Sequence, residues 1–580
     1  MHAGHNAAIR RSRAEKAPLR QVGRALCYLA PLALPFVSAC AGAGLPPASA
    51  TASAGSAPTI SAERLSRDVR TLASDAFGGR APGTAGEDRT IEWLVAELQA
   101  IGLEPAGPDG QWTQPVPLVR TQLGTGPVSA NVNGSTVDLR QGQDVYMSTL
   151  RPVSAIEVAA APMVFVGYGV SAPERGWDDF KGADLQGKVA VFLVNDPDFR
   201  TTPGDAAHGR FGGKAMTYYG RWTYKFEEAA RRGAIAALIV HATDAAGYGW
   251  ATVTAPGGEN YDVAGASDRV ALQGWLNEAA ADRLFTAAGH DPAALRASAA
   301  SPDFRPVDLG ATFDANLPVT HESLMSRNVL ARLPGSTRPD EVVLYGAHWD
   351  AYGEGEPDAE GRTIRPGAND DALGVAGLLE IARAFKAGPA PQRSIGFGFW
   401  TAEERGLLGS ETYARDPVFP SAKTVANITL DIMQTGGPSR DILLVGEGQS
   451  TLEDMLKAAA GAQGRTVTPE TLPERGLFYR ADHFSLAKRG VPTLLLMAIS
   501  GAPDLVQGGR AAGQTWLDGY MACYHQTCDA WSAQLDFGSA AQDTDLAFHV
   551  GRDLAFSDQW PDWKAGSEFA QIRSTDRGQR

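Results

Sequence analysis

The sequence predicts an α/β protein whose main sheet is mostly parallel and is covered by helices. From residue 328 onward, short apolar segments of strand length alternate with helical patterns. The segments with strand character are 342–345, 394–400, 425–430 and 493–497. The clearest helix is 371–385, where Val375, Leu378 and Leu379 recur at helical spacing. Residues 160–300 show the same alternation on a smaller scale, which predicts a second α/β part inserted into the first.

The N-terminal part of the fold begins with two expected helices. Residues 60–72 and 91–98 carry apolar side chains at helical spacing, and the Gly-rich segment 78–84 separates them. Residues 112–150 have the pattern of short strands divided by Gly, Asn and Pro. We expect both regions to belong to the main part of the fold.

The inserted part contains its own strands and helix. Residues 163–166, 189–194 and 234–240 are short apolar strands, and residues 226–232 form a helix ending at Gly233. We therefore predict a domain over 156–304, placed between the two segments of the main domain, 59–155 and 305–560. Residues 565–580 are predicted to be a polar, frayed tail.

Composition and charge exclude some classes of function. A hydrophobic content of 44% and a charged content of 20% are ordinary for a globular domain in water. The net charge of −14 argues against a nucleic-acid groove, which needs clustered Lys and Arg. Nothing in the sequence indicates an oligomeric state.

The N-terminus has the layout of an export signal. Six basic residues between positions 10 and 24 precede the apolar run 26–37, which is too short to span a membrane. The run ends at Val37-Ser38-Ala39-Cys40, which resembles a bacterial lipobox. We expect a signal over 1–40, a lipid anchor at Cys40 as the only membrane contact, and a flexible linker over 41–58. This predicts a periplasmic or outer-membrane-anchored lipoprotein; the alternative is ordinary cleavage near Ala48-Ser49-Ala50, which would give a secreted protein.

Two cysteines, Cys523 and Cys528, flank His525 in the predicted folded part. An oxidising compartment would let them pair, so we expect a disulfide. The alternatives are two buried thiols or two thiolate zinc ligands, although no second Cys or His pair lies nearby.

Five residues of metal-binding type occur in separate short motifs at strand ends or in loops. They are His348 in Y-G-A-H-W-D, Asp370 in A-N-D-D-A, Glu404 in T-A-E-E-R, Asp431 in I-T-L-D-I and His525 in C-Y-H-Q-T-C-D. Each is ordinary alone; Asp370, for example, could simply cap the helix that follows. Two imidazoles and three carboxylates are too few for two closed zinc sites of about four ligands each. They suffice for two adjacent ions if one carboxylate bridges them.

Two further carboxylates stand beside these candidates. Glu403 precedes Glu404 and is not needed as a ligand, so it is a candidate general base. Asp350 lies two residues after His348 and could orient its imidazole. Competing motifs are absent from the sequence: the His321-Glu322 pair lacks the second His of H-E-x-x-H, and there is no nucleophile elbow or phosphate loop.

The order of these motifs is similar to that of the dizinc exopeptidases of metallopeptidase family twenty-eight. This family includes secreted bacterial aminopeptidases and the glutamate carboxypeptidase II group. Residues 75–84 resemble the opening of its catalytic domain, 328–336 the strand before the first ligand, and 160–300 its inserted protease-associated domain. The resemblance implies a three-layer sandwich of the zinc-exopeptidase type, two zinc ions per chain, and peptide substrates.

The resemblance also implies a role for each residue. His348 and Asp431 would hold one zinc, Glu404 and His525 the other, and Asp370 would bridge them. Glu403 would be the general base. Tyr524 matches a tyrosine that donates to the oxyanion in carboxypeptidase-like members, and the alternative is a packing tyrosine.

The segment Arg480-Ala481-Asp482-His483 departs from this pattern and contains a competitor for the fifth ligand. From the sequence alone His483 competes with His525, but the equivalent family segment lines the site without binding metal. Ala481 and Leu373 replace the family's usual serines. Neither is a ligand, so these changes bear on specificity more than on catalysis.

We therefore expect a zinc exopeptidase, an aminopeptidase acting outside the cytoplasm, with the inserted domain as a lid over the cleft. A carboxypeptidase or dipeptidase of the same fold is the alternative, because a rim segment offers both acidic and basic groups for a substrate terminus. Those groups are Glu470, Glu474, Arg475 and Arg480. A one-zinc glutaminyl cyclase fits less well, since both half-sites are complete. A receptor-like binding protein is the alternative from another class.

Overall fold

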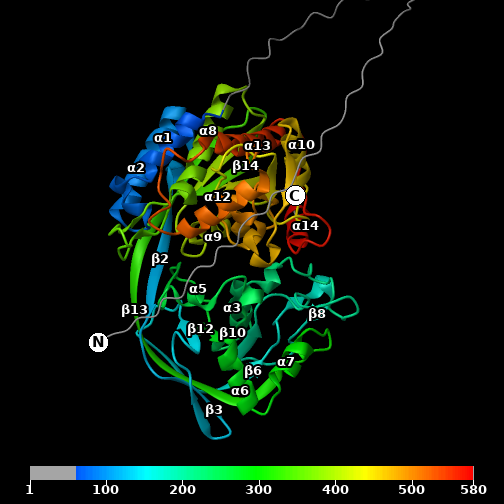
Figure 1. Cartoon of the computed structure of the whole chain (residues 1–580). Coiled ribbons are helices and arrows are strands. Elements are labelled where there is room, and N and C mark those ends of the chain that lie inside the picture. The colour runs from blue at the N-terminus through cyan, green and yellow to red at the C-terminus, as the bar shows by residue number, and fades with distance from the viewer. Residues whose placement is uncertain (1–59, 579–580) are drawn as a thin grey trace, which may run out of the picture. The chain divides into compact units, whose positions relative to one another are not determined.

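The computed structural model describes residues 60–578 (Figure 1). The expected signal over 1–40, the lipidation site Cys40 and the linker over 41–58 lie outside the described residues. Among the helices between residues 60 and 578, none combines the length and apolar character needed to cross a membrane.

The main sheet is mostly parallel, as predicted. Four strands run parallel in the order β21-β18-β14-β17. Their bounds are β14 (Arg338–His348), β17 (Arg393–Trp400), β18 (Thr424–Leu430) and β21 (Thr493–Leu496). Every residue of β17 and β18 is buried, which explains why both segments are continuous apolar runs. The long β13 (Val307–Leu333) adds an antiparallel neighbour to β17.

Helices cover both faces of this sheet, so the predicted sandwich is confirmed. One face shares a hydrophobic core with four helices, α1 (Ala62–Leu72), α2 (Ala85–Ile101), α8 (Leu373–Ala387) and α13 (Phe537–Ala555). Figure 1 shows α8 and α13 beside β14. On the opposite face, Leu344 and Trp400 pack against Tyr413 of α9 (Leu408–Arg415) and Leu486 of α11 (His483–Ala487).

The helix predicted over 371–385 starts two residues later. Ala368–Ala372 form a separate π-helical turn, η5, that contains Asp370 and Asp371. The Asp371 side chain accepts a hydrogen bond from the main-chain N–H of Gly374 at 2.8 Å, in the first turn of α8. The Asp371 side chain therefore caps the N-terminal end of α8, and Asp370 lies before the helix.

The second part of the structure has its own parallel strands. They are β6 (Ala155–Phe165), β9 (Val189–Leu193), β10 (Ala236–His241) and β12 (Leu272–Asn277), which are hydrogen-bonded in that order. The helix predicted over 226–232 is α3 (Trp222–Arg231). Its hydrophobic core is distinct from the core of the main sheet.

Strand β13 joins the two parts into one continuous sheet (Figure 1). Its first half pairs with β6, and its second half pairs with β2 (Thr113–Leu123) and β17. Two strands that precede residue 156, β3 (Val128–Val132) and β5 (Val145–Ser148), also pair on the side of the second part. The second part therefore begins earlier than the predicted boundary, because β13 is long enough to accept strands along both halves.

The C-terminal residues are not the frayed tail that the sequence predicts. Residues Ala570–Gly578 form helix α14. Phe569 and Arg573 are each 2% exposed, and Arg573 donates hydrogen bonds to the carbonyl oxygens of Ser421 and Thr424. One aromatic ring and one buried guanidinium thus attach an otherwise polar segment to the fold.

Candidate metal centre

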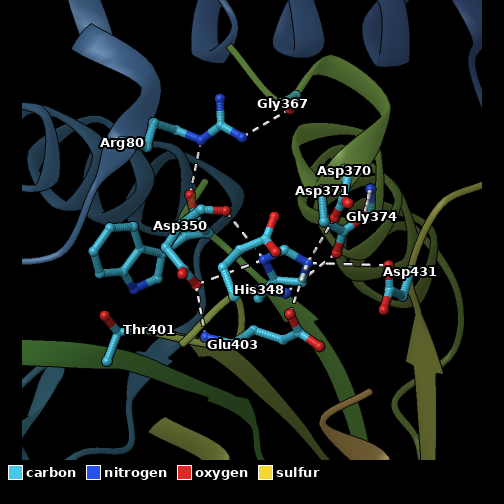
Figure 2. A network of polar contacts seen from close by, with 12 residues as sticks. Arg80, His348, Asp350, Gly367, Asp370, Asp371, Gly374, Thr401, Glu403 and Asp431 are labelled. Atoms are coloured by element: carbon cyan, nitrogen blue, oxygen red, sulfur yellow. Dashed lines mark hydrogen bonds and ion pairs between the residues drawn. The ribbon is translucent and has the colours of Figure 1, made fainter. Parts of the chain in front are cut away.

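The candidate ligands lie at the carboxyl ends of the parallel strands. His348 is the last residue of β14, Asp431 directly follows β18, and Glu404 follows β17 by four positions. Parallel strands end at the same edge of a sheet, so this arrangement brings the three side chains together. Asp370 reaches the same place from η5, and His525 follows α12 (Gly509–Cys523). Figure 2 shows His348, Asp370 and Asp431 converging with Glu403.

Asp370 presents one carboxylate oxygen to each histidine. Its Oδ1 lies 3.1 Å from Nε2 of His348, and its Oδ2 lies 3.2 Å from Nε2 of His525. Oε2 of Glu404 lies 3.2 Å from Nε2 of His525, and Oδ1 of Asp431 lies 4.0 Å from Nε2 of His348. Two groups result, His348-Asp370-Asp431 and Asp370-Glu404-His525, each with its ligand atoms within 4.8 Å of one another. Each group could hold a metal ion, and they share Asp370.

The charges of the two groups fit a pair of cations. Burial, followed by the carboxylate of Asp370, raises the pKa of Asp431 to about 8 and that of Glu404 well above its usual range. Oδ1 of Asp431 is buried without a hydrogen-bond partner among the described residues. Crowded buried carboxylates need positive charge close by. Imidazole nitrogen and carboxylate oxygen are donors that suit zinc.

Glu403 belongs to neither group but lies beside both. Its Oε2 is 4.0 Å from Nε2 of His348, and the residue lines the same cavity as Asp370 and Glu404. Burial, and then the neighbouring carboxylate of Asp431, raises the pKa of Glu403 well above its usual range. Glu403 is close to the two groups of candidate ligands but is not one of them, so its carboxylate is free to exchange a proton with a water molecule at the centre.

Asp350 lies beside the His348 imidazole with both its main chain and its side chain. Nδ1 of His348 lies 3.1 Å from the main-chain carbonyl oxygen of Asp350 and 3.6 Å from its carboxylate oxygen. The same carboxylate oxygen also accepts a hydrogen bond from the main-chain N–H of Glu403 at 3.1 Å. Asp350 therefore contacts the imidazole of His348 and also holds the main chain of the base candidate, Glu403.

Arg80 is a buried cation behind the centre that the sequence did not single out. It is 0% exposed, and its guanidinium donates hydrogen bonds to four main-chain carbonyl oxygens; Figure 2 shows the one to Gly367. The acceptors are Trp349 at 2.8 Å, Pro366 at 2.6 Å, Gly367 at 2.8 Å and Leu72 at 3.0 Å. One side chain thus connects the end of β14 to the loop before Asp370. Its place in the Gly-Gly-Arg turn was visible in the sequence, but its contacts were not.

Asp529 is a second residue missed by the sequence analysis. Its Oδ1 accepts the main-chain N–H of Asn369 at 3.0 Å, and its Oδ2 accepts that of Asp370 at 3.1 Å. Burial raises the pKa of Asp529 to about 7. The only sequence signal is that Asp529 directly follows Cys528 in the motif around His525.

The segment around His525 is held by a disulfide and by aromatic rings. Cys523 and Cys528 are bonded, which confirms the expected pairing. The ring centroids of Tyr524 and Tyr352 lie 3.6 Å and 4.4 Å from that of His525. Burial raises the pKa of Tyr524 well above its usual value, so its hydroxyl stays protonated and able to donate.

A cavity of about 2250 Å³ opens onto both groups. Its lining includes Glu403 and His525 from the main part and Trp222 and Tyr261 from the second part. Of the four rim candidates, all of which lie in the described part of the chain, Arg480 alone lines this cavity. His483 joins neither group; burial lowers its pKa to about 3, and its ring packs against Phe478 with centroids 4.8 Å apart.

Comparison with known proteins identifies the segment that carries the centre. Residues 328–550 match peptidase family M28. The resemblance to that family is confirmed. The M28 segment contains all five candidate ligands, as well as Asp350, Glu403 and Asp529.

Two curated relatives of the M28 segment illustrate the similarity. Leupeptin-inactivating enzyme 1 of Streptomyces exfoliatus is 28% identical over 205 residues, which cover 35% of this chain and 43% of that protein. The probable lipoprotein aminopeptidase LpqL of Mycobacterium tuberculosis is 27% identical over 228 residues, covering 37% and 42%. The chain thus spans less than half the length of these relatives. Among solved structures, an aminopeptidase from Aneurinibacillus sp. strain AM-1 aligns with a TM-score of 0.47 and 19% identity, covering 87% of this chain and 96% of that one.

Proposed function

We propose that this chain is a zinc-dependent exopeptidase that releases N-terminal residues from peptides. The observation that carries the proposal is the position of Asp370, with one carboxylate oxygen facing each of two histidines and Glu403 outside both groups. The match of residues 328–550 to peptidase family M28 supports it, as do relatives that are named aminopeptidases.

In this proposal His348 and Asp431 would hold one zinc ion, Glu404 and His525 would hold the other, and Asp370, which belongs to both groups, would serve both sites. When bound, the two ions supply Lewis acidity, which polarises a peptide carbonyl and brings the pKa of a water molecule towards neutrality. Glu403 accepts the proton of the attacking water and returns it to the leaving amine, for which it must come within about 3 Å of that water.

Two other residues assist the reaction in this proposal, Asp350 and Tyr524. Asp350 fixes the main chain of Glu403 through its hydrogen bond, so the carboxylate stays directed at the centre. The Tyr524 hydroxyl, which remains protonated, donates to the oxyanion that forms on the scissile carbonyl. Asp350 therefore positions the base, while Tyr524 touches the reacting atoms.

The cavity also supports the direction of cleavage. A free α-amine is a cation, and the wall of the cavity carries acidic side chains besides the proposed ligands and base, among them Glu259 and Glu356. The second part of the fold supplies another part of that wall, including Trp222 and Tyr261. We propose that residues 156–304 are a protease-associated domain that restricts the centre to short peptides.

We also propose that the protein is exported and anchored through a lipid on Cys40. The disulfide beside His525 supports an oxidising compartment, and the relative LpqL is named a lipoprotein. Incorporation of labelled palmitate into the full chain, but not into Cys40→Ser, would test this anchor.

The experiment that tests the function combines metal analysis with two blocked peptides. One peptide has a free N-terminus only, the other a free C-terminus only, and wild type is compared with Glu403→Gln. We expect about two zinc ions per chain in both proteins, cleavage of the peptide with the free N-terminus, and near-total loss of cleavage in the variant. Cleavage of the other peptide would make it a carboxypeptidase. Absence of metal and of any cleavage would leave a binding protein on a peptidase fold.

A further inference from the structure

Arg221 is a buried cation without a counter-charge. It directly precedes helix α3, is 6% exposed and lines the cavity of the metal centre. Its Nε is buried without a hydrogen-bond partner, and among residues 60–578 no carboxylate forms an ion pair with it. Its only cation–π contact in the described structure is with the adjacent Trp222, 5.8 Å from the ring centroid. A buried charge without a partner is costly, so such a group usually serves a ligand.

Arg480 supplies a second unpaired guanidinium to the same cavity. It comes from the main part of the fold, and no described carboxylate pairs with it either. The two chain segments approach closely at Gly476, which has φ +58° and where a Cβ would lie 3.3 Å from Cδ of Arg221. Arg480 follows that glycine by four positions. Each part of the fold therefore contributes one arginine to the wall of the same cavity.

Two other arginines of this cavity do have carboxylate partners. Arg269 pairs with Asp262 at 2.7 Å, and Arg405 lies 3.8 Å from a carboxylate oxygen of Glu259. Arg221 and Arg480 instead have each other as neighbours: burial first, and then the charge of Arg480, lowers the pKa of Arg221 to about 10. The charge of Arg480 also lowers the pKa of Asp431, but Asp431 belongs to the proposed metal centre, and no described carboxylate forms an ion pair with either guanidinium.

We propose that Arg221 and Arg480 form a subsite for a carboxylate group of the peptide substrate. The planar guanidinium forms paired hydrogen bonds with carboxylates, and two such groups bind one anion more firmly than either alone. The inference rests on the proposed function and deepens it, because it defines the substrates as short peptides bearing an anchoring carboxylate. That carboxylate is either the free C-terminus of a short peptide or an acidic side chain next to the cleaved bond.

The test compares matched peptides in wild type, Arg221→Gln and Arg480→Gln. Leu-Gly-Gly against its C-terminal amide reports the free C-terminus, and Leu-Glu-amide against Leu-Gln-amide reports an acidic side chain. We expect wild type to prefer the charged member of one pair. Each arginine variant should reduce that preference, as a ratio of kcat/KM values, about tenfold to a hundredfold, mainly through KM. Arg200→Gln is the control, since Arg200 forms an exposed pair with Asp244, outside the cavity.

A binding measurement separates this subsite from catalysis and from folding. In the Glu403→Gln background, calorimetric titration with the preferred peptide should show weaker binding for each arginine variant. The melting temperature of Arg221→Gln should not fall, because the change removes an unpaired buried charge. If Arg221→Gln does unfold, the peptide preference and the peptide binding of Arg480→Gln decide whether the subsite exists. Cleavage with unchanged preferences in the arginine variants would overturn the subsite and leave the peptidase intact. Preference-dependent binding without cleavage by wild type would sustain the subsite and reject the peptidase.

Discussion

The main-chain N–H of Glu403 donates a hydrogen bond to Oδ1 of Asp350 over 3.1 Å. Asp350 is fully buried, and its own carbonyl oxygen faces Nδ1 of His348 at 3.1 Å. One residue therefore contacts both a proposed zinc ligand and the proposed base. Groups that hold a ligand or a base are often nearly as important as the groups they hold.

Replacing Asp350 should weaken the centre without removing a ligand. Asp350→Ala loses the acceptor for Glu403, and we expect activity or zinc affinity to fall about 10- to 100-fold. Asp350→Asn keeps a carbonyl oxygen as acceptor and should retain more activity than the alanine variant. Zinc titration and kcat on one peptide measure the two effects separately. Equal behaviour of wild type and Asp350→Ala would show that the hydrogen bond has no functional role.

Asp529 should matter for stability because it binds two buried N–H groups of the loop that carries Asp370. Asp529→Ala leaves both without a partner, and we expect unfolding to require about 2–4 kcal/mol less free energy. Urea unfolding of the zinc-free protein measures this difference. Asp518→Asn, an exposed position on α12, is the control and should change little. A loss as small as that of the control would mean that the loop finds other partners.

Arg80 should not tolerate lysine. Its hydrogen bonds to Trp349, Pro366, Gly367 and Leu72 require the spread donors of a guanidinium, which an ammonium group cannot reproduce. We expect Arg80→Lys to lower the free energy of unfolding by about 2–4 kcal/mol. Arg89→Lys, at an exposed position of α2, is the matched control. Full stability of Arg80→Lys would contradict the assigned role.

His483 should make the protein less stable as the pH falls. Burial lowers its pKa in the folded chain to about 3, from an ordinary value of 6.5. Between these two values the unfolded chain binds a proton at His483 that the folded chain does not bind. The stability of wild type relative to His483→Met should therefore fall by about 1 kcal/mol between pH 7.5 and 5.5. Urea unfolding at both pH values measures it.

His549 gives the opposite sign and serves as the comparison. Asp545 raises its pKa, so the folded chain binds the proton more readily, and this stabilisation is present at low pH and lost as the pH rises through the folded pKa. His549→Gln should therefore be more destabilising at pH 5.5 than at pH 7.5. A relative stability of His483→Met that does not change with pH would show that His483 takes up protons in the folded state.

Much of the fold and of the centre was predictable from short patterns. The strands of the main sheet are buried on both faces and are therefore continuous apolar runs, and three candidate ligands, His348, Glu404 and Asp431, lie at or within four positions of their carboxyl ends. The boundary of the second part was not predictable in this way, because it depends on strand β13 pairing along both of its halves. The tail was mistaken for loose chain, since two buried side chains in a polar segment, Phe569 and Arg573, leave no periodic signal.

The order of short motifs at strand ends and in loops was enough to indicate the five candidate ligands and Glu403. Three relationships appear only in the folded chain: Asp370 faces both histidines, Asp350 contacts both His348 and Glu403, and Arg80 and Asp529 bind the same loop. Folding also brings Arg221 and Arg480 to one cavity. The physical reason is that strand and helix patterns are local, whereas these hydrogen bonds and charges depend on residues that lie from tens to hundreds of positions apart in the chain.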